Sequence, residues 1–201
     1  MVRPRRYDDD EILEVARQVF LEHGPAASLQ LVADALGLSP PALLKRFGTK
    51  EALMVRALAP PADLPWVERL FRGPDDRPLP EQLLEIAKGA MALFGDSTGA
   101  MLTLRASGID LQALLEHDHP TSPVRVRAAL VAFFAEARAA GRLRPCEPDR
   151  LATAFIGALQ ARALESHLFG VPLEAAEQQA HAAAIVDLLW RGARPDPLEA
   201  L

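Results

Sequence analysis

Basic side chains gather at two places in the first fifty residues of this 201-residue chain, a pattern that suits contact with phosphate groups. The formal net charge of the chain is −5, but residues 1–50 hold equal numbers of basic and acidic side chains. The excess of negative charge therefore lies in the rest of the chain, and the clustered basic residues form a local positive patch on an otherwise acidic protein. The two groups are Arg3, Arg5 and Arg6, and then Lys45, Arg46 and Lys50.

The second basic group lies in a stretch, residues 28–50, whose spacing predicts a helix-turn-helix. Ala33 is small where a second helix crosses close to the first. Gly37 stands where the chain leaves the first helix, a position that favours a left-handed backbone. A unit of this kind places its second helix in the major groove of DNA. The apolar side chains expected in its core are Val32, Leu36, Leu38, Leu43 and Phe47.

Capping residues, glycines and prolines predict where the other helices begin and end. A first helix is expected over about residues 10–23, and Ser28, Ser39 and Thr49 are expected to open the next three. The fourth helix should end near Ala59, before a proline-rich boundary that contains a short helix around residues 64–71. Gly95-Asp96 is a predicted break. The later helices are expected over 80–95, 98–117, 123–140, 147–169 and 173–192.

Composition favours an all-α fold in which helices pack on helices. Half of the residues are hydrophobic, only 5% are aromatic, and runs that alternate with period two are absent. No apolar stretch approaches the roughly 20 residues that span a bilayer, and the first residues do not resemble a secretory signal. The single cysteine, Cys146, excludes an internal disulfide. We therefore expect a cytoplasmic protein that does not contact a membrane.

These features, in this order, resemble the TetR (tetracycline-repressor-like) family of bacterial transcription regulators. The likeness covers about residues 10–55 in register and is architectural beyond residue 60. It implies a helix-turn-helix DNA-binding domain over residues 1–55, a helix end and linker over 56–80, an effector-binding and dimerisation domain over 81–192, and a tail over 193–201. The matching positions are Ile12, Leu13, Ala16, Phe20, Gly24, Ser28, Leu29, Val32, Ala33, Leu36, Gly37, Leu38, Ser39, and Phe47 to Leu53.

The resemblance implies which residues read the bases. Gln30 matches a position that often reaches a base edge, and glutamine can pair with adenine or bond guanine. Pro40, Pro41 and Ala42 match the leading edge of the recognition helix, where they offer only apolar contact, for instance with thymine methyl groups. Arg46, on the exposed side, is a candidate for guanine or for a phosphate.

The resemblance also implies which residues hold the DNA backbone. Ser28, Thr49 and Lys50 match phosphate clamps at helix N-termini. The family commonly has a phosphate-binding tyrosine where this chain has Leu44, so that contact is lost and Lys45 is the candidate to replace it. A basic N-terminal arm follows the backbone or enters the minor groove. That arm carries Arg3, Arg5 and Arg6.

The resemblance implies two tasks for the larger domain. The last two helices, about residues 147–192, would pair with a second copy, as a twofold operator requires. The alternative is internal packing alone. A small-molecule effector would bind inside the helices between residues 80 and 170, although its apolar candidates also suit a plain core. The candidate pocket residues are Met91, Phe94, Met101, Leu102, Arg105, Phe133, Phe134, Phe155 and Gln160.

We expect a homodimeric regulator, a repressor that an unknown small molecule releases from a palindromic double-stranded DNA operator, with no cofactor and no metal. The competing hypothesis is an interaction module whose recognition surface binds a protein, which Leu44 and the prolines favour. A helical enzyme is a third hypothesis, but no acid–base pair or nucleophile constellation supports it. His117 and His119 are interpreted as surface residues rather than metal ligands, and Cys146 as an inert thiol.

Overall fold

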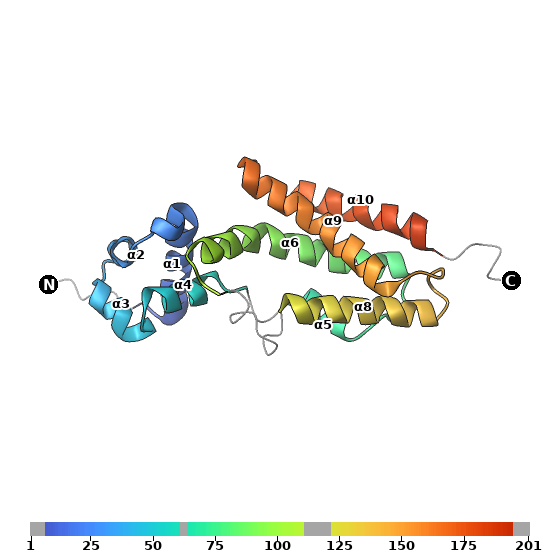
Figure 1. Ribbon diagram of the computed structural model, residues 1–201, viewed down its shortest axis with the longest axis horizontal. Coiled ribbons are helices and arrows are strands. Elements are labelled where there is room, and N and C mark those ends of the chain that lie inside the picture. Colours follow the sequence, from blue (N-terminus) through green and yellow to red (C-terminus); the bar gives the residue numbers. More distant parts are fainter. Residues whose placement is uncertain (1–6, 61–63, 111–121, 195–201) are drawn as a thin grey trace. The chain divides into compact units, whose positions relative to one another are not determined.

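The computed structural model describes residues 7–60, 64–110 and 122–194, and these residues form helices and turns without a strand (Figure 1). The predicted all-α class is confirmed. A short 3₁₀ turn, Gly24–Ala26, follows the first helix. The helices are α1 (Asp9–His23), α2 (Leu29–Leu36), α3 (Pro40–Phe47), α4 (Lys50–Leu58), α5 (Pro65–Phe71), α6 (Leu79–Ala106), α8 (Pro123–Ala139), α9 (Pro148–Phe169) and α10 (Ala175–Ala193).

Helices α1, α2 and α4 begin where the sequence predicts because polar side chains cap them, whereas Ser39 before α3 forms no side-chain cap bond. Asp8 accepts a hydrogen bond from the backbone N–H of Glu11, and the Glu11 side chain accepts one from the N–H of Asp8, which completes a capping box. The hydroxyls of Ser28 and Thr49 each accept one hydrogen bond from a backbone N–H three residues later and so cap α2 and α4. These caps satisfy backbone N–H groups that a helix leaves without partners.

The chain divides into two compact units, and the first contains the helix-turn-helix. It spans Met1–Ala59 and Gly99–Leu114, so the end of α6 belongs to it. Ala100 and Leu104 of α6 are fully buried in the same core as the apolar faces of α1 to α4. The unit therefore includes residues beyond the predicted range 1–55. Other buried members of this core are Ile12, Ala16, Phe20, Val32, Leu36, Leu43, Phe47, Leu53 and Leu58.

The second unit spans Pro60–Thr98 and Leu115–Leu201 and has its own core. Helices α5 and α9 both pack on α8, and α10 packs on α9. Phe134 lies at its centre, where its ring meets the rings of Phe133 and Phe155 edge-on at 6.0 Å. Such edge-to-face pairs are favourable because the positive edge of one ring meets the negative face of another.

The predicted break at Gly95-Asp96 is wrong, because α6 continues through it as one helix (Figure 1). The backbone of Gly95 does not adopt a positive φ, and a side chain at this position would crowd the amide of Gln178 on α10. Glycine here allows a close approach between helices instead of ending one. A helical glycine costs roughly 1 kcal/mol relative to alanine, which tertiary packing readily offsets.

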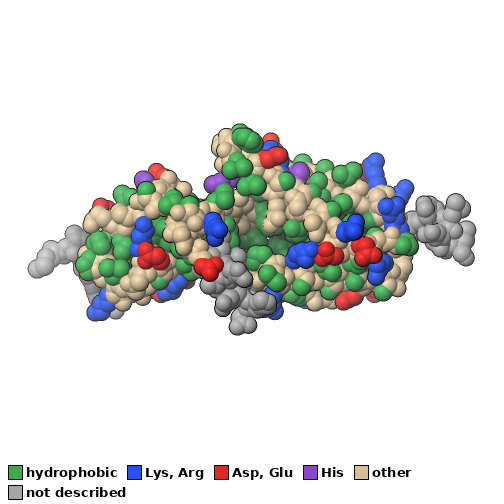
Figure 2. Space-filling view, viewed as in Figure 1, with side chains coloured by type: hydrophobic (Ala, Val, Ile, Leu, Met, Phe, Trp, Pro, Cys, Tyr) green, Lys and Arg blue, Asp and Glu red, His purple; other side chains and the backbone are tan. Residues whose placement is uncertain are grey.

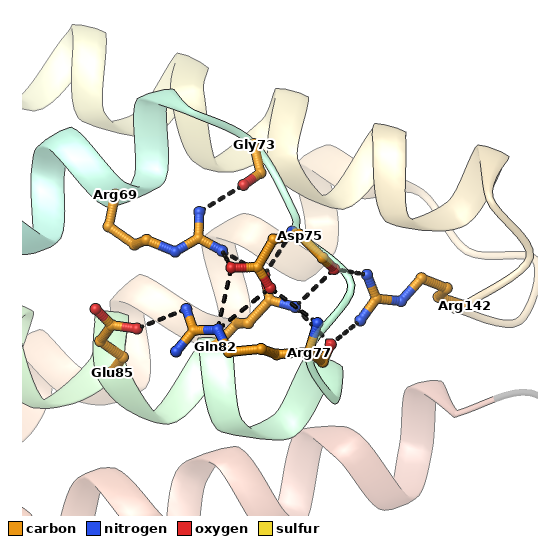
Figure 3. Close-up of polar contacts among 7 residues, drawn as sticks. All are labelled: Arg69, Gly73, Asp75, Arg77, Gln82, Glu85 and Arg142. Carbon is orange, nitrogen blue, oxygen red and sulfur yellow. Dashed lines mark hydrogen bonds and ion pairs between the residues drawn. The ribbon is translucent and has the colours of Figure 1, made fainter.

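A polar network fastens the loop between α5 and α6 (Figure 3). At its centre Gln82, fully buried on α6, accepts hydrogen bonds from Arg69 at 2.7 Å and from the backbone N–H of Asp75 at 2.9 Å. Its amide donates to the carbonyl oxygens of Asp75 and Arg77. Arg69, itself buried, also donates to the carbonyl of Gly73. Every polar atom of the Gln82 side chain is therefore satisfied.

Charged groups extend this network to the turn after α8. Arg69 and Arg77 both bond the carboxylate of Asp75, at 2.7 and 3.0 Å, and Arg77 also reaches Glu85 at 3.0 Å. The guanidinium of Arg142 donates to the carbonyl oxygens of Asp75 and Arg77. Although desolvation opposes the shift, hydrogen bonds from Arg77 and the charges of Arg69 and Arg77 lower the pKa of Asp75.

The network predicts a pH-dependent contribution to stability. Because the pKa of Asp75 in the folded chain lies below its ordinary 3.8, the contribution is present above that value and is lost as the pH falls through the lower one. Asp75→Asn should therefore lower Tm at about pH 7, and the deficit should shrink at about pH 3. Circular dichroism melts test this, with Asp76→Asn as the control. A deficit of the same size at both pH values would contradict it.

Candidate nucleic-acid interface

The turn between α2 and α3 has the backbone that the sequence predicts. Gly37 adopts a left-handed conformation with φ of 64°, and the N–H of Leu38 donates to the carbonyl of Ala33 at 2.9 Å. This bond closes α2 two residues beyond its last residue and sends the chain sharply into α3. Ala33 is fully buried, as expected for a small residue at a close helix crossing.

The buried face of α3 determines which of its residues face outward. Leu43 and Phe47 lie in the core, with 1% and 7% of their surfaces exposed. At about 100° per residue, Pro41, Ala42 and Lys45 project from the opposite side, and all three are exposed. Two further residues are placed differently. Pro40 is half-buried, whereas Leu44 is exposed on one flank.

Gln30 is exposed on α2, two residues after the cap Ser28. Its amide nitrogen donates a hydrogen bond to the carboxylate of Asp34, one turn later, at 2.6 Å. A glutamine amide has two hydrogens and one carbonyl oxygen, so this bond leaves one donor and the acceptor for a base edge. Asp34 thus orients the residue that is predicted to read a base.

The start of α4 carries the residues that the resemblance assigns to a phosphate contact. The hydroxyl of Thr49 accepts a hydrogen bond from the N–H of Ala52 at 3.0 Å. The next two residues of this first turn, Lys50 and Glu51, carry opposite charges. The ammonium of Lys50 donates to the carbonyl of Pro25 at 3.4 Å, a long bond that a phosphate could replace. A helix N-terminus with a lysine in its first turn favours a phosphate electrostatically.

Arg46 lies on the opposite flank of α3 from Leu44, and its guanidinium group bonds residues at the start of α1. It forms an ion pair with Asp9 and donates to the backbone carbonyl of Tyr7 at 2.7 Å. Arg56 of α4 also bonds Asp9, at 3.1 Å, and stacks over the ring of Phe47 at 4.9 Å. We call these five residues, Tyr7, Asp9, Arg46, Phe47 and Arg56, the Asp9 cluster.

Sequence reasoning missed this cluster. Asp9 lies far along the sequence from both Arg46 and Arg56, and no short-range spacing pairs these residues. In the structure desolvation opposes the shift, but hydrogen bonds from Arg56 and Arg46 outweigh it and lower the pKa of Asp9. Asp9 therefore keeps its charge at neutral pH. The arm residues Arg3, Arg5 and Arg6 lie outside the described residues.

The predicted pocket residues do not form one group. Four of them, Met91, Phe133, Phe134 and Phe155, are fully buried in the core of the second unit, and Phe94 packs against it. Gln160 is exposed on α9. The other three lie on the end of α6 that belongs to the first unit, where one is partly buried and two are exposed. These are Met101, Leu102 and Arg105.

The second unit has hollows beside and within this aromatic core. Phe134 and Phe155 border a space of only about 10 Å³, enough for a single water molecule. Phe133 lies at the edge of an open hollow of about 320 Å³ between α5 and α8, whose polar side chains are Arg125 and Glu136. The guanidinium of Arg125 lies over the exposed ring of Phe71 at 5.5 Å.

The described residues contain no group of three His, Cys, Asp or Glu side chains that could hold a metal ion. His117 and His119 lie outside the described residues, and Cys146 is half-buried near the start of α9. None of the described helices is long and apolar enough to cross a membrane.

Family models match both parts of the chain. Residues 12–57 match the model of bacterial regulatory proteins of the tetR family. Residues 81–192, more than half of the chain, match the C-terminal domain of AefR-like transcriptional repressors. The first match contains the helix-turn-helix, and the second begins at the start of α6 and runs almost to the end of α10.

Individual proteins show the same likeness. The HTH-type transcriptional repressor BdcR of Escherichia coli (strain K12) is 29% identical over 170 residues, which cover 82% of this chain and 83% of BdcR. The TetR family regulator PfmR from Thermus thermophilus superposes with a TM-score of 0.67 at 23% identity, over 90% of this chain and 98% of PfmR. SCO0520 from Streptomyces coelicolor is 28% identical, with a TM-score of 0.53 and coverage of 94% and 99%.

Proposed function

Because the chain belongs to the tetR family of bacterial regulatory proteins, it is a ligand-responsive, DNA-binding transcriptional regulator, and we propose that it is a repressor. A small molecule would bind the second unit and release the protein from a palindromic operator. The observation that carries DNA binding is the helix-turn-helix, with the exposed face of α3 opposite its buried side chains, and the similarity to the repressor BdcR and to AefR-like repressors supports the repressor role.

We propose that the exposed residues of α2, α3 and α4 divide the work of binding DNA. Gln30 contacts a base edge, and Pro41 and Ala42 make apolar contacts with bases. Lys45, on the outermost side of α3, contacts a phosphate in place of the tyrosine that Leu44 replaces. The N-terminus of α4, with Thr49 and Lys50, binds a second phosphate. Ser28 and Pro40 support the starts of their helices beside these contacts, and Arg3, Arg5 and Arg6 extend the footprint.

The function is tested by selecting binding sites from randomised double-stranded DNA and by gel shifts on the promoter region next to the gene. Sequence-preferring, salt-sensitive binding is expected.

Lys45→Ala should weaken binding to all sites evenly and reduce the slope of log affinity against log salt by about one for each half-site, with Tm unchanged. Lys88→Ala, an exposed lysine on α6, is the control. An unchanged slope would show that Lys45 does not contact a phosphate.

We propose that α9 and α10 form the dimer interface, because both carry exposed apolar stripes at helical spacing. Every fourth residue on one side of α10 is an exposed alanine or leucine, and α9 has a matching run. Figure 2 shows hydrophobic side chains gathered at the top of the view, where α9 ends and α10 begins. The stripes consist of Ala176, Ala180, Ala184 and Leu188, and of Gly157, Ala161, Leu164 and Leu168.

A charge in these stripes should separate the protomers. Leu188 is 66% exposed, and Leu188→Glu removes apolar contact and places a charge where a partner would bury it. The dimer should dissociate at least about tenfold more readily, and binding to two half-sites should weaken in parallel. Sedimentation at several concentrations measures this. Val124→Glu, on α8, is the matched control at 57% exposure, and equal behaviour of both variants would contradict the interface.

Trp66 supports a ligand site in the second unit. Among the described residues its indole nitrogen is the buried side-chain atom that has no hydrogen-bond partner. The side chain lies so close to α6 that a Cβ atom on Gly89 would come within 2.3 Å of its Cγ atom. Buried donors are rarely left without a partner, so such a group calls for an explanation. We propose that this N–H donates to an acceptor atom of the effector.

Trp66→Phe removes the donor but keeps an aromatic ring over Gly89. DNA binding should change little and Tm should fall modestly, because the smaller ring leaves a small cavity, whereas the compound concentration that releases DNA should rise about tenfold, the loss of one buried hydrogen bond. A gel-shift screen of small molecules supplies the compound. Trp190→Phe, on α10, is the control, and its response should equal that of the wild type. If both variants respond like the wild type, Trp66 does not bind the effector.

The other hypotheses find less support. The matched families are transcription regulators, so an interaction module that binds protein through α3 is not favoured, and an enzyme has no support from them. Because its partner would be chromosomal DNA, we propose that the protein acts in the cytoplasm.

A further inference from the structure

Arg46 is held by two bonds that both lead to the start of α1. Its Nη1 atom donates to the carbonyl oxygen of Tyr7 at 2.7 Å, and its Nε atom pairs with the carboxylate of Asp9. The Arg46 side chain is 38% exposed. Planar guanidinium groups are well suited to such two-directional contacts, because their donors have fixed relative directions.

Asp9 connects three helices through one carboxylate. It lies in the first turn of α1 and bonds Arg46 of α3 and Arg56 of α4 with different oxygens. The guanidinium of Arg56 also covers the ring of Phe47, which is buried in the core. The carboxylate sits at the positive end of the α1 dipole, which stabilises its charge. The Asp9 cluster therefore fixes α3 against its two neighbours at its C-terminal end.

We infer that Arg46 is a positioning residue, which sets the orientation of α3 through Asp9 and Tyr7, and that it does not read a base. The inference rests on the DNA-binding function of the chain. Sequence preference then comes from Gln30 and from the outward face of α3. If the guanidinium left Asp9 to reach DNA, it would give up both of its bonds, and Arg56 alone would balance the charge of Asp9.

Whether Asp9→Ala weakens or strengthens DNA binding distinguishes a positioning role from a purely electrostatic one. Removal of a negative charge from a DNA-binding surface should strengthen binding if charge alone matters. If Asp9 positions Arg46 and α3, Asp9→Ala should instead weaken binding, by about tenfold, as should Arg46→Ala. The double variant should bind like either single one, because both changes remove the same arrangement. Asp10→Ala, a neighbouring exposed acid, is the matched control and should bind no more weakly than the wild type.

Two further measurements test whether Arg46 contacts DNA directly. Affinities are measured for single base-pair substitutions in the selected site and over a range of salt concentrations. Arg46→Ala should lower the affinity for every site by the same factor. It should leave the slope of log affinity against log salt unchanged, whereas Lys45→Ala should reduce that slope. Arg46→Lys should not restore binding, because an ammonium cannot make both bonds.

The outcomes separate the inference from the function itself. If the wild type selects no DNA sequence, the proposed function fails. If it does, and Arg46→Ala relaxes preference at one base pair or lowers the salt slope, Arg46 contacts DNA and the inference is wrong. Stronger binding by Asp9→Ala would likewise overturn it and show that Asp9 masks the arginines. Circular dichroism confirms that each variant is folded.

Discussion

The contact of α2 with α3 at Ala33 is the constraint on which the rest of the first unit depends. Because this residue is fully buried and carries only a methyl group, the second helix can cross closely enough for Leu43 and Phe47 to enter the common core. Their burial in turn directs Pro41, Ala42 and Lys45 outward. A larger side chain at position 33 would separate the helices and rotate the DNA-facing surface away from its partner.

Local signals predicted most of the fold. Ser28, Thr49 and Gly37 each indicate a helix end through the chemistry of a few neighbouring residues, and the predicted bounds of the first four helices lie within a residue or two of the observed ones. Gly95 misled because a glycine at a break and a glycine at a close helix approach look the same in sequence. Only Gln178 on α10, far along the chain, distinguishes the two cases.

The sites were less predictable, because they depend on contacts between distant residues. Gln30 and Lys45 follow from helix periodicity once the buried face is known, but Arg46 appears on the same helix and is turned toward Asp9, across more than thirty residues. Likewise, the apolar pattern of α6 does not reveal that Met91 packs in one core and Met101 against the other. Periodicity gives the face of a helix but not the partner of that face.

Pro40 and Pro41 give the recognition helix a property beyond its contacts. Two consecutive prolines restrict the backbone of the first turn even in the unfolded chain, and they remove two N–H groups that would otherwise need partners. The leading edge of α3 is therefore ordered before it meets DNA. If α3 enters the groove as proposed, association requires little loss of conformational entropy at this edge, and selectivity there comes from shape complementarity rather than from hydrogen bonding.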